Sequence, residues 1–219
     1  TEEINEAFDT DAKVLSANEL LYAATLTNDK ARQEAIYKKT TELYPNDFRA
    51  YNNLGMMAYA NGDFTTAENY FKQAASKDAN APEVNTNLGY IELVKGNVAN
   101  AETYLSKSTG ANTANEALGN LYIKQGQYDR AVQAFGDTKT NSAALAQILA
   151  KDYNKAKNTL NAVKNPDAYT DYLMAIVGAR TNNADLVKTS MAKVAQKDAT
   201  LAAKAQIDRE FAKYANEIK

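Results

Sequence analysis

Three pairs of glycines with one common spacing constrain the fold of this 219-residue chain more than any other feature of its sequence. The two glycines of each pair are seven residues apart, and the first of them always follows a leucine. The pairs are Gly55 and Gly62, Gly89 and Gly96, and Gly119 and Gly126. Small residues that recur at fixed offsets indicate a chain built from copies of one structural unit.

Other residues keep the same phase as the glycines. Twelve residues after each first glycine there is an alanine, and four residues further on there is a phenylalanine or a leucine. These residues are Ala67, Ala101 and Ala131, followed by Phe71, Leu105 and Phe135. A weaker copy contains Ala144, Tyr153, Ala156 and Leu160. We interpret each copy as two antiparallel helices, in which small residues opposite large ones allow close packing.

The two glycines of a copy have different roles in this interpretation. The first lies within a helix, where glycine costs about 1 kcal/mol relative to alanine, so we expect a neighbouring helix to pack closely there. The second ends that helix as a left-handed cap. Asp63 and Asn97 are then expected to cap the following helix. The aromatic residues in phase with these positions are expected in the core, namely Tyr51, Phe64, Phe71, Tyr128 and Phe135.

The composition supports helices and excludes several kinds of chemistry. Alanine and leucine, both strong helix formers, are abundant, and there are only three prolines. The chain contains no cysteine and no histidine, which excludes imidazole or thiolate metal sites and Ser-His or Cys-His catalytic pairs. A net charge of -2 argues against nucleic-acid binding. No apolar run approaches the roughly 20 residues of a membrane-spanning helix.

The segment Ala50 to Ala79 resembles the tetratricopeptide repeat (TPR) family in its aromatic residue, Leu-Gly pair, Asn-Gly-Asp turn and later Ala and Phe. The 34 residues between Gly55 and Gly89 match the period of that family. The resemblance implies an all-α fold, a right-handed α-solenoid of about five TPR-like helix pairs plus a C-terminal capping helix. Later copies are spaced by only 30 and 25 residues, so we expect shorter helices there.

The repeats divide the chain into three parts. Residues 1–13 are acidic and are expected to be frayed or a linker. Residues 14–200 are expected to form the TPR-like helical repeat domain, and residues 201–219 the capping helix. Because the sequence begins with Thr1, we expect it to be a mature chain or an excised piece of a longer one.

The resemblance also implies a binding site, because TPR proteins hold an extended or helical peptide in a concave groove lined by the first helix of each pair. Asparagine can hydrogen-bond a peptide backbone in both directions, and tyrosine offers apolar area with a polar tip. Replacing Asn87 and Tyr90 is expected to weaken binding with little effect on stability. The residues expected to line the groove are Asn52, Asn53, Met56, Tyr59, Thr86, Asn87, Tyr90, Leu93, Asn120 and Lys124.

One subclass of TPR proteins is not matched. Chaperone-binding members hold a C-terminal carboxylate with a clamp of lysine, asparagine and arginine. Asn53 and Asn87 occupy clamp-like positions, but Thr113 and Ala117 stand where the basic residues are required. Without these cations an anionic terminus lacks its charge-assisted hydrogen bonds, so we do not expect chaperone-tail binding.

These observations together favour a non-catalytic scaffold that binds a protein or peptide, without cofactor or metal. The segments ELLYAATL and AIYKKTTELYPNDFRAYNNLG are similar to TPR regions of cell-envelope proteins from Bacteroidetes-type bacteria. That similarity favours a periplasmic or cell-envelope location, in a bacterial envelope or exported protein. An alternative is a glycan-binding helical module of an outer-membrane uptake system. The absence of tryptophan, the favoured sugar-stacking residue, ranks this alternative below peptide binding.

Overall fold

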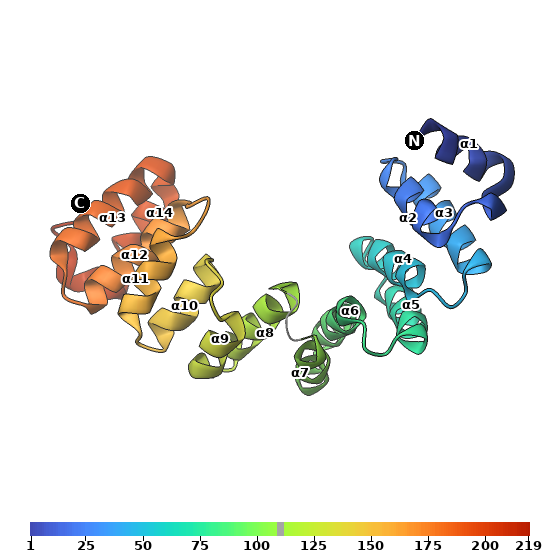
Figure 1. Cartoon of the computed structure of the whole chain (residues 1–219). Helices are drawn as coiled ribbons and strands as arrows, with labels where there is room; N and C mark the ends of the chain where they lie inside the picture. The colour runs from blue at the N-terminus through green and yellow to red at the C-terminus, as the bar shows by residue number, and fades with distance from the viewer. Residues whose placement is uncertain (109–111) are drawn as a thin grey trace. The chain divides into compact units, whose positions relative to one another are not determined.

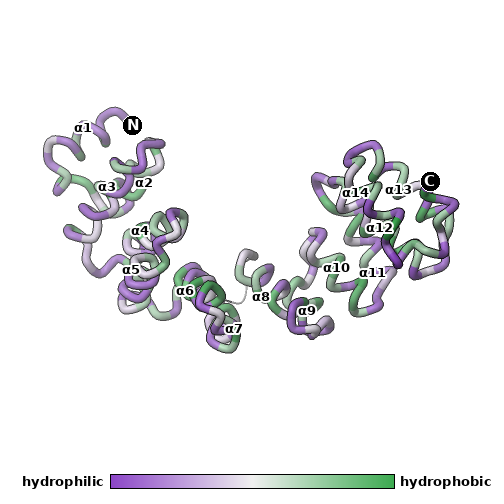
Figure 2. Tube along the Cα trace, turned by 180° about the vertical axis from the view of Figure 1, so that it is seen from behind, coloured by the Kyte–Doolittle hydropathy of each residue, from purple (hydrophilic) through white to green (hydrophobic). Residues whose placement is uncertain are grey.

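A computed structural model describes residues 1–108 and 112–219 of the chain (Figure 1). Every regular element in these residues is a helix, and helices that follow one another along the chain pack in antiparallel pairs. The expected all-α repeat fold is therefore confirmed. The chain forms two compact units, Thr1–Ala114 and Asn115–Lys219, and each is described by itself. Hydrophobic and hydrophilic residues alternate along the helices of both units (Figure 2).

The first unit contains a leading helix followed by three helix pairs. The pairs are α2 with α3, α4 with α5, and α6 with α7. The bounds of its elements are α1 Glu2–Asp11, η1 Ala12–Val14, α2 Ala17–Thr25, α3 Lys30–Leu43, α4 Phe48–Ala60, α5 Phe64–Lys77, α6 Pro82–Val94 and α7 Val98–Lys107.

The second unit contains the remaining pairs and a terminal segment. The bounds of its elements are α8 Asn112–Lys124, whose first three residues belong to the first unit, α9 Tyr128–Phe135, α10 Asn141–Leu149, α11 Tyr153–Asn161, α12 Ala168–Arg180, α13 Ala184–Lys197, α14 Ala199–Ala205 and η2 Arg209–Tyr214. Helices α9, α10 and α11 have 8, 9 and 9 residues, whereas α5 has 14. The shortening expected from the spacing is confirmed. Six helix pairs can be followed through the described residues of the chain, against the about five expected.

The first glycine of each copy lies where the partner helix approaches most closely. In each case the large residue sixteen positions further on packs against the glycine. A Cβ on Gly89 would lie 2.8 Å from both Cγ and Cδ2 of Leu105, closer than two carbon atoms can pack. The three pairs in this relation are Gly55 with Phe71, Gly89 with Leu105, and Gly119 with Phe135. The close helix approach expected at the first glycine is therefore confirmed, and its partner is the large residue that keeps the same phase in each copy.

The second glycines have the expected left-handed conformation, with φ of +76°, +78° and +72° at Gly62, Gly96 and Gly126. The last two pairs use other residues at the same turn. Lys151 has φ of +65° and Asn182 has φ of +55°. A side chain in this region of φ is strained, more so for lysine than for asparagine, which tolerates it better. The turn geometry is thus retained where the glycine is not.

One expectation about the aromatic core needs correction. Phe71 and Phe135 are buried, and Tyr51 and Tyr128 are half-buried, but Phe64 is 37% exposed. Phe64 is the first residue of α5, and its ring packs edge-on against Tyr59 at the surface, so the prediction that it lies in the core was wrong. The remaining four aromatic residues pack inside the helix pairs to varying degrees.

The helix caps also differ from one copy to the next. The Asp63 side chain accepts a hydrogen bond from the backbone N–H of Thr66, as expected for a cap of α5. Asn97 makes no cap hydrogen bond with its side chain and instead donates to Glu92 Oε2 at 2.9 Å. Asn97 therefore occupies the N-cap position of α7 as expected, but it does not make the expected side-chain cap hydrogen bond. Glu92 is buried at 7% exposure, and the Asn97 hydrogen bond, with further support from Lys95, holds its pKa below the usual range.

The first residues of the chain are not frayed. They form α1, which packs on α2 and η1, and the side chains of Ile4, Ala7 and Phe8 contact the buried core of the first helix pair. Arg32 on α3 pairs with Asp9 at 2.9 Å and lies over the ring of Phe8. The expectation of a frayed or linker segment missed the amphipathic spacing of these apolar residues, which gives them one common face.

The C-terminal residues cover the last helix pair as expected, although not as one helix. They form the short helix α14 and then the 3₁₀ helix η2. Phe211 and Tyr214 are buried against α12 and α13. Tyr172 donates a hydrogen bond to Asp208, and Arg180 pairs with Glu210 at 2.8 Å. These polar contacts hold the terminal segment on the pair that it covers.

Candidate binding site

The first helices of neighbouring pairs in the first unit, α4 and α6, carry most of the residues expected in the groove. We call the part of this surface formed by the half-buried or exposed side chains the A face. Met56 is its most accessible member, at 51% exposure. The A face consists of Asn53, Met56 and Tyr59 on α4, and Asn87, Tyr90 and Leu93 on α6.

A hydrogen bond between two asparagines joins α4 to α6 beneath the A face. Asn87 Nδ2 donates to Asn52 Oδ1 at 2.9 Å. The Asn52 side chain is 5% exposed, and its own Nδ2 lies 3.8 Å from the sulfur of Met56. A buried amide oxygen requires a donor, and Asn87 supplies it from the neighbouring repeat. This bond sets the register of the two helices and thereby the spacing of the residues above it.

Aromatic side chains form the other end of the A face. The rings of Tyr59 and Tyr90 are 6.5 Å apart and tilted by 43°, and Phe64 packs edge-on against Tyr59 at 5.1 Å. The hydroxyl of Tyr90 donates to the backbone oxygen of Thr113 at 3.3 Å. The A face therefore has amide groups at one end and aromatic area at the other.

Two residues expected to line the groove lie below its surface. Asn52 and Thr86 are buried, and the Thr86 hydroxyl donates to the backbone oxygen of Pro82 at 2.8 Å. Their polar groups are used inside the protein, so they support the A face and present little area to a ligand. Asn120 and Lys124, also expected in the groove, lie on α8 within the second unit, half-buried and exposed respectively.

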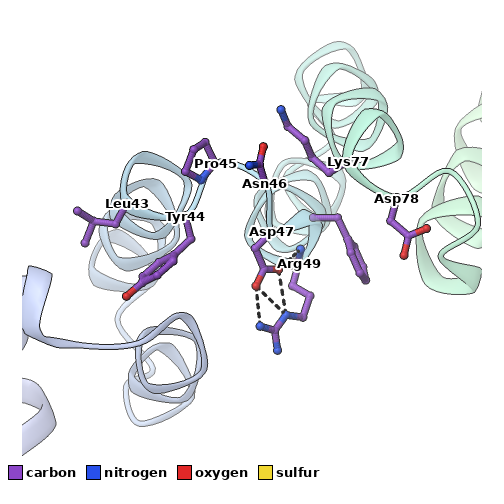
Figure 3. Close-up of a pocket in the computed structure, with 9 residues that line it drawn as sticks. Leu43, Tyr44, Pro45, Asn46, Asp47, Arg49, Lys77 and Asp78 are labelled. Carbon is purple, nitrogen blue, oxygen red and sulfur yellow. Dashed lines mark hydrogen bonds and ion pairs between the residues drawn. The ribbon is translucent and has the colours of Figure 1, made fainter.

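A hollow of about 680 Å³ opens at the loop that leads into α4 (Figure 3). Arg49, three residues before Asn52, forms a close ion pair with Asp47 at 2.6 Å and donates to Asn18 of α2 at 2.8 Å. The Arg49 guanidinium holds the pKa of Asp47 below its usual range. Sequence analysis missed Arg49 and Asn18, although the helical spacing from Arg49 to Asn52 was a usable signal.

The rest of the described chain offers no metal site and no membrane span. Among the residues that the structure describes, no group of acidic side chains is arranged to hold a metal ion. Within the same residues, none of the helices combines the length and the apolar character needed to cross a bilayer. The polar groups of the A face are amides and phenols, which suit hydrogen bonding and contact area.

Family models described as tetratricopeptide repeat match three overlapping or adjoining segments of the chain. These segments are residues 36–69, 53–116 and 116–139. The matches contain all six glycines of the repeat and both helices of the A face. No curated protein sequence matches the chain significantly.

Solved structures share the fold at low sequence identity. PilF of Pseudomonas aeruginosa is 13% identical, with a TM-score of 0.68 over 89% of this chain and 93% of that one. YrrB, described as a TPR protein with an unusual peptide-binding site, is 18% identical, with a TM-score of 0.61 over 78% and 98%. A chain of the APC/C hetero-tetramer Cut9–Hcn1 is 16% identical, with a TM-score of 0.66 over 99% of this chain. Our chain spans 45% of the length of that one.

Proposed function

Because this chain is a tetratricopeptide-repeat protein, we propose that it is a non-catalytic scaffold whose A face binds an extended segment of a protein partner. The observation that carries the proposal is the hydrogen bond from Asn87 to Asn52, which fixes two repeats in register beneath the A face. An extended peptide presents alternating backbone donors and acceptors along its length, so a rigid surface with amides at set positions can pair with them.

The chemistry of the A face decides what such a segment contains. The Asn53 side chain makes no hydrogen bond within the described residues, and the Asn87 side chain has an amide oxygen left after its N–H pairs with Asn52. Both side chains can therefore bond a peptide backbone. Met56, Tyr59 and Leu93 supply apolar area for one or two hydrophobic side chains of the partner, as in other peptide-binding interfaces. Because the A face carries no charged side chain, the contacted part of the segment needs none.

Two finer aspects belong to the same proposal. We propose that the protein lies in the periplasm or cell envelope of a bacterium, because its first repeats are similar to envelope TPR regions. Cell fractionation would test this location.

Glycan binding is the second candidate function, since Tyr59 and Tyr90 are neighbouring aromatic rings. Their planes are tilted by 43°, so the two rings do not form one continuous flat platform for a sugar, and the peptide is favoured.

The test begins with selection of displayed random peptides against the full chain. The variant Asn53→Ala/Met56→Ala changes the A face, and Asn69→Ala/Gln73→Ala on the exposed side of α5 is its matched control. We expect the first variant to weaken binding of a selected peptide about tenfold and the control to leave it unchanged. The chain has four methionines, and on ¹³C-methyl labelling the Met56 resonance should shift when the peptide binds.

Three results would contradict the proposal. They are failure to enrich any peptide, equal loss of affinity in both variants, and binding on a glycan array without binding to peptides. Thermal melts of both variants should lie close to that of the unchanged protein, because the replaced side chains are on the surface.

A further inference from the structure

A second hollow lies in the second unit, between the second helices of its last two pairs. It has a volume of about 230 Å³ and is bounded by α11, the start of α12, and α13. Its floor is apolar, formed by Leu160, Val163, Met174 and Leu186. Its rim is polar and includes Lys157 on α11 and Lys193 on α13. We call this site the lysine hollow.

The charges at the lysine hollow are unbalanced. Neither Lys157 nor Lys193 forms an ion pair within the described residues, and both are exposed. One carboxylate, Asp171, also lines the hollow, but Lys197 pairs with it at 2.7 Å and neutralises it. The second unit as a whole carries 15 lysines and arginines against 11 aspartates and glutamates. A partner that enters this hollow therefore meets a net positive rim.

We propose that the lysine hollow binds an acidic peptide segment that also contains an apolar residue. A glutamate or aspartate of the segment lies between Lys157 and Lys193, and the neighbouring apolar side chain rests on Met174 and Leu186. Asn161 and Thr189 on the rim offer hydrogen bonds to the peptide backbone. Charge selects the segment, and the apolar floor adds affinity that salt does not screen.

The lysine hollow differs from the A face in three respects: the unit in which it lies, the helices that form it and the polar groups that it presents. The A face uses first helices of the first unit and amide groups, whereas the lysine hollow uses second helices of the second unit and cationic groups. One molecule can thus hold two segments of different composition. The two proposals fail independently because each has its own methionine reporter, Met56 for the A face and Met174 for the hollow.

The test uses a short synthetic peptide of alternating glutamate and leucine, titrated into the full chain by calorimetry. The variant Lys157→Glu/Lys193→Glu reverses both rim charges. The control Lys139→Glu/Lys204→Glu makes the same change in net charge at exposed positions of the second unit that do not line the hollow. We expect the rim variant to bind about tenfold or more weakly and the control to bind like the unchanged protein.

Two control peptides and a methyl NMR spectrum test whether the peptide binds through its charge and at the lysine hollow. Replacing glutamate by glutamine, or leucine by alanine, should weaken binding, and the Met174 methyl resonance should shift with the original peptide while that of Met56 does not. The proposal is overturned if both charge variants lose affinity equally, if the glutamine peptide binds as well, or if Met174 does not respond. It is also overturned if anionic vesicles or RNA shift Met174 and the acidic peptide does not. Circular dichroism of the variants should match that of the unchanged protein.

Discussion

The side chain of Leu105 occupies the space in which any residue other than glycine at position 89 would place its Cβ. Gly89→Ala gains about 1 kcal/mol in helix propensity but forces Leu105 out of its position, and overpacking of this kind costs about 1–3 kcal/mol. We expect a net loss of about 1 kcal/mol in the free energy of unfolding, measured with urea. In a Leu105→Ala background the same substitution should be neutral or stabilising, because the added methyl group then fills part of a cavity. Equal losses in both backgrounds would contradict the contact.

The turns of the last two helix pairs contain non-glycine residues at positive φ, and replacing them by glycine should relieve the backbone strain. Lys151→Gly places a residue suited to positive φ where lysine has φ of +65°. We expect a gain of about 1 kcal/mol, or about 2–4 °C in Tm for a chain of this length. Asn182→Gly should gain less, because asparagine tolerates this conformation. A lower Tm for Lys151→Gly would show that the lysine side chain stabilises the turn in a way that the backbone geometry does not indicate.

The hydrogen bond beneath the A face gives Asn87 a structural role. Asn87→Ala leaves the buried Asn52 oxygen without its donor, which costs about 1–3 kcal/mol. The expectation that replacing Asn87 and Tyr90 leaves stability nearly unchanged therefore does not hold for Asn87. The variant Asn52→Ala/Asn87→Ala should lose less than the sum of the two single variants. Strict additivity in chemical denaturation would argue against the bond.

Burial of the recurring alanine can be tested at Ala101, which is fully buried between α6 and α7. Ala101→Glu places an unpaired charge in the core and should destabilise the protein by about 3 kcal/mol or more. Ala99→Glu provides the control, because Ala99 is an exposed alanine in the first turn of the same helix. Circular dichroism melts should separate the two variants clearly. Coincident melts would disprove the placement of Ala101.

The environment of Glu92 predicts that the stability of the protein depends on pH. The hydrogen bond from Asn97 lowers the pKa of Glu92 in the folded state below its ordinary value of 4.5. A carboxylate with a lowered pKa contributes stability above its unfolded pKa, and this contribution disappears as the pH falls through the folded pKa. Glu92→Gln should therefore be less stable than the unchanged protein at neutral pH, with a difference that shrinks below about pH 4. A difference independent of pH would show that the charge of Glu92 is not involved.

The repeat could be predicted wherever glycine or alanine marks a close contact. The repeat spacing predicted a close helix approach at Gly89, which Leu105 makes in the structure, and it predicted the left-handed turn at Gly96. At Lys151 and Asn182 the same turn is formed without glycine, because a single strained residue costs little relative to the packing around it. The tetratricopeptide models likewise stop at residue 139, before these two turns.

The candidate site was predicted less completely than the fold. Helical spacing placed Asn52 and Thr86 on the side of the helices that faces the groove, but both are buried. Their burial depends on the distance between neighbouring first helices, and helical spacing within one repeat carries no information about that distance. The lysine hollow was not predicted, because Lys157 and Lys193 are far apart in the sequence and come to line one hollow only through the packing of α11 and α13 against α12. Isolated lysines on helices carry no signal of their own.

The terminal segment that holds Phe211 and Tyr214 over α12 and α13 has a consequence for self-association. A stack of similar hairpins presents at its last member an apolar surface that matches the first hairpin of another molecule, and a head-to-tail contact of that kind has no geometric reason to close into a ring. With that surface occupied by Phe211 and Tyr214, we expect no head-to-tail addition of further molecules on the face of α12 and α13 that they cover.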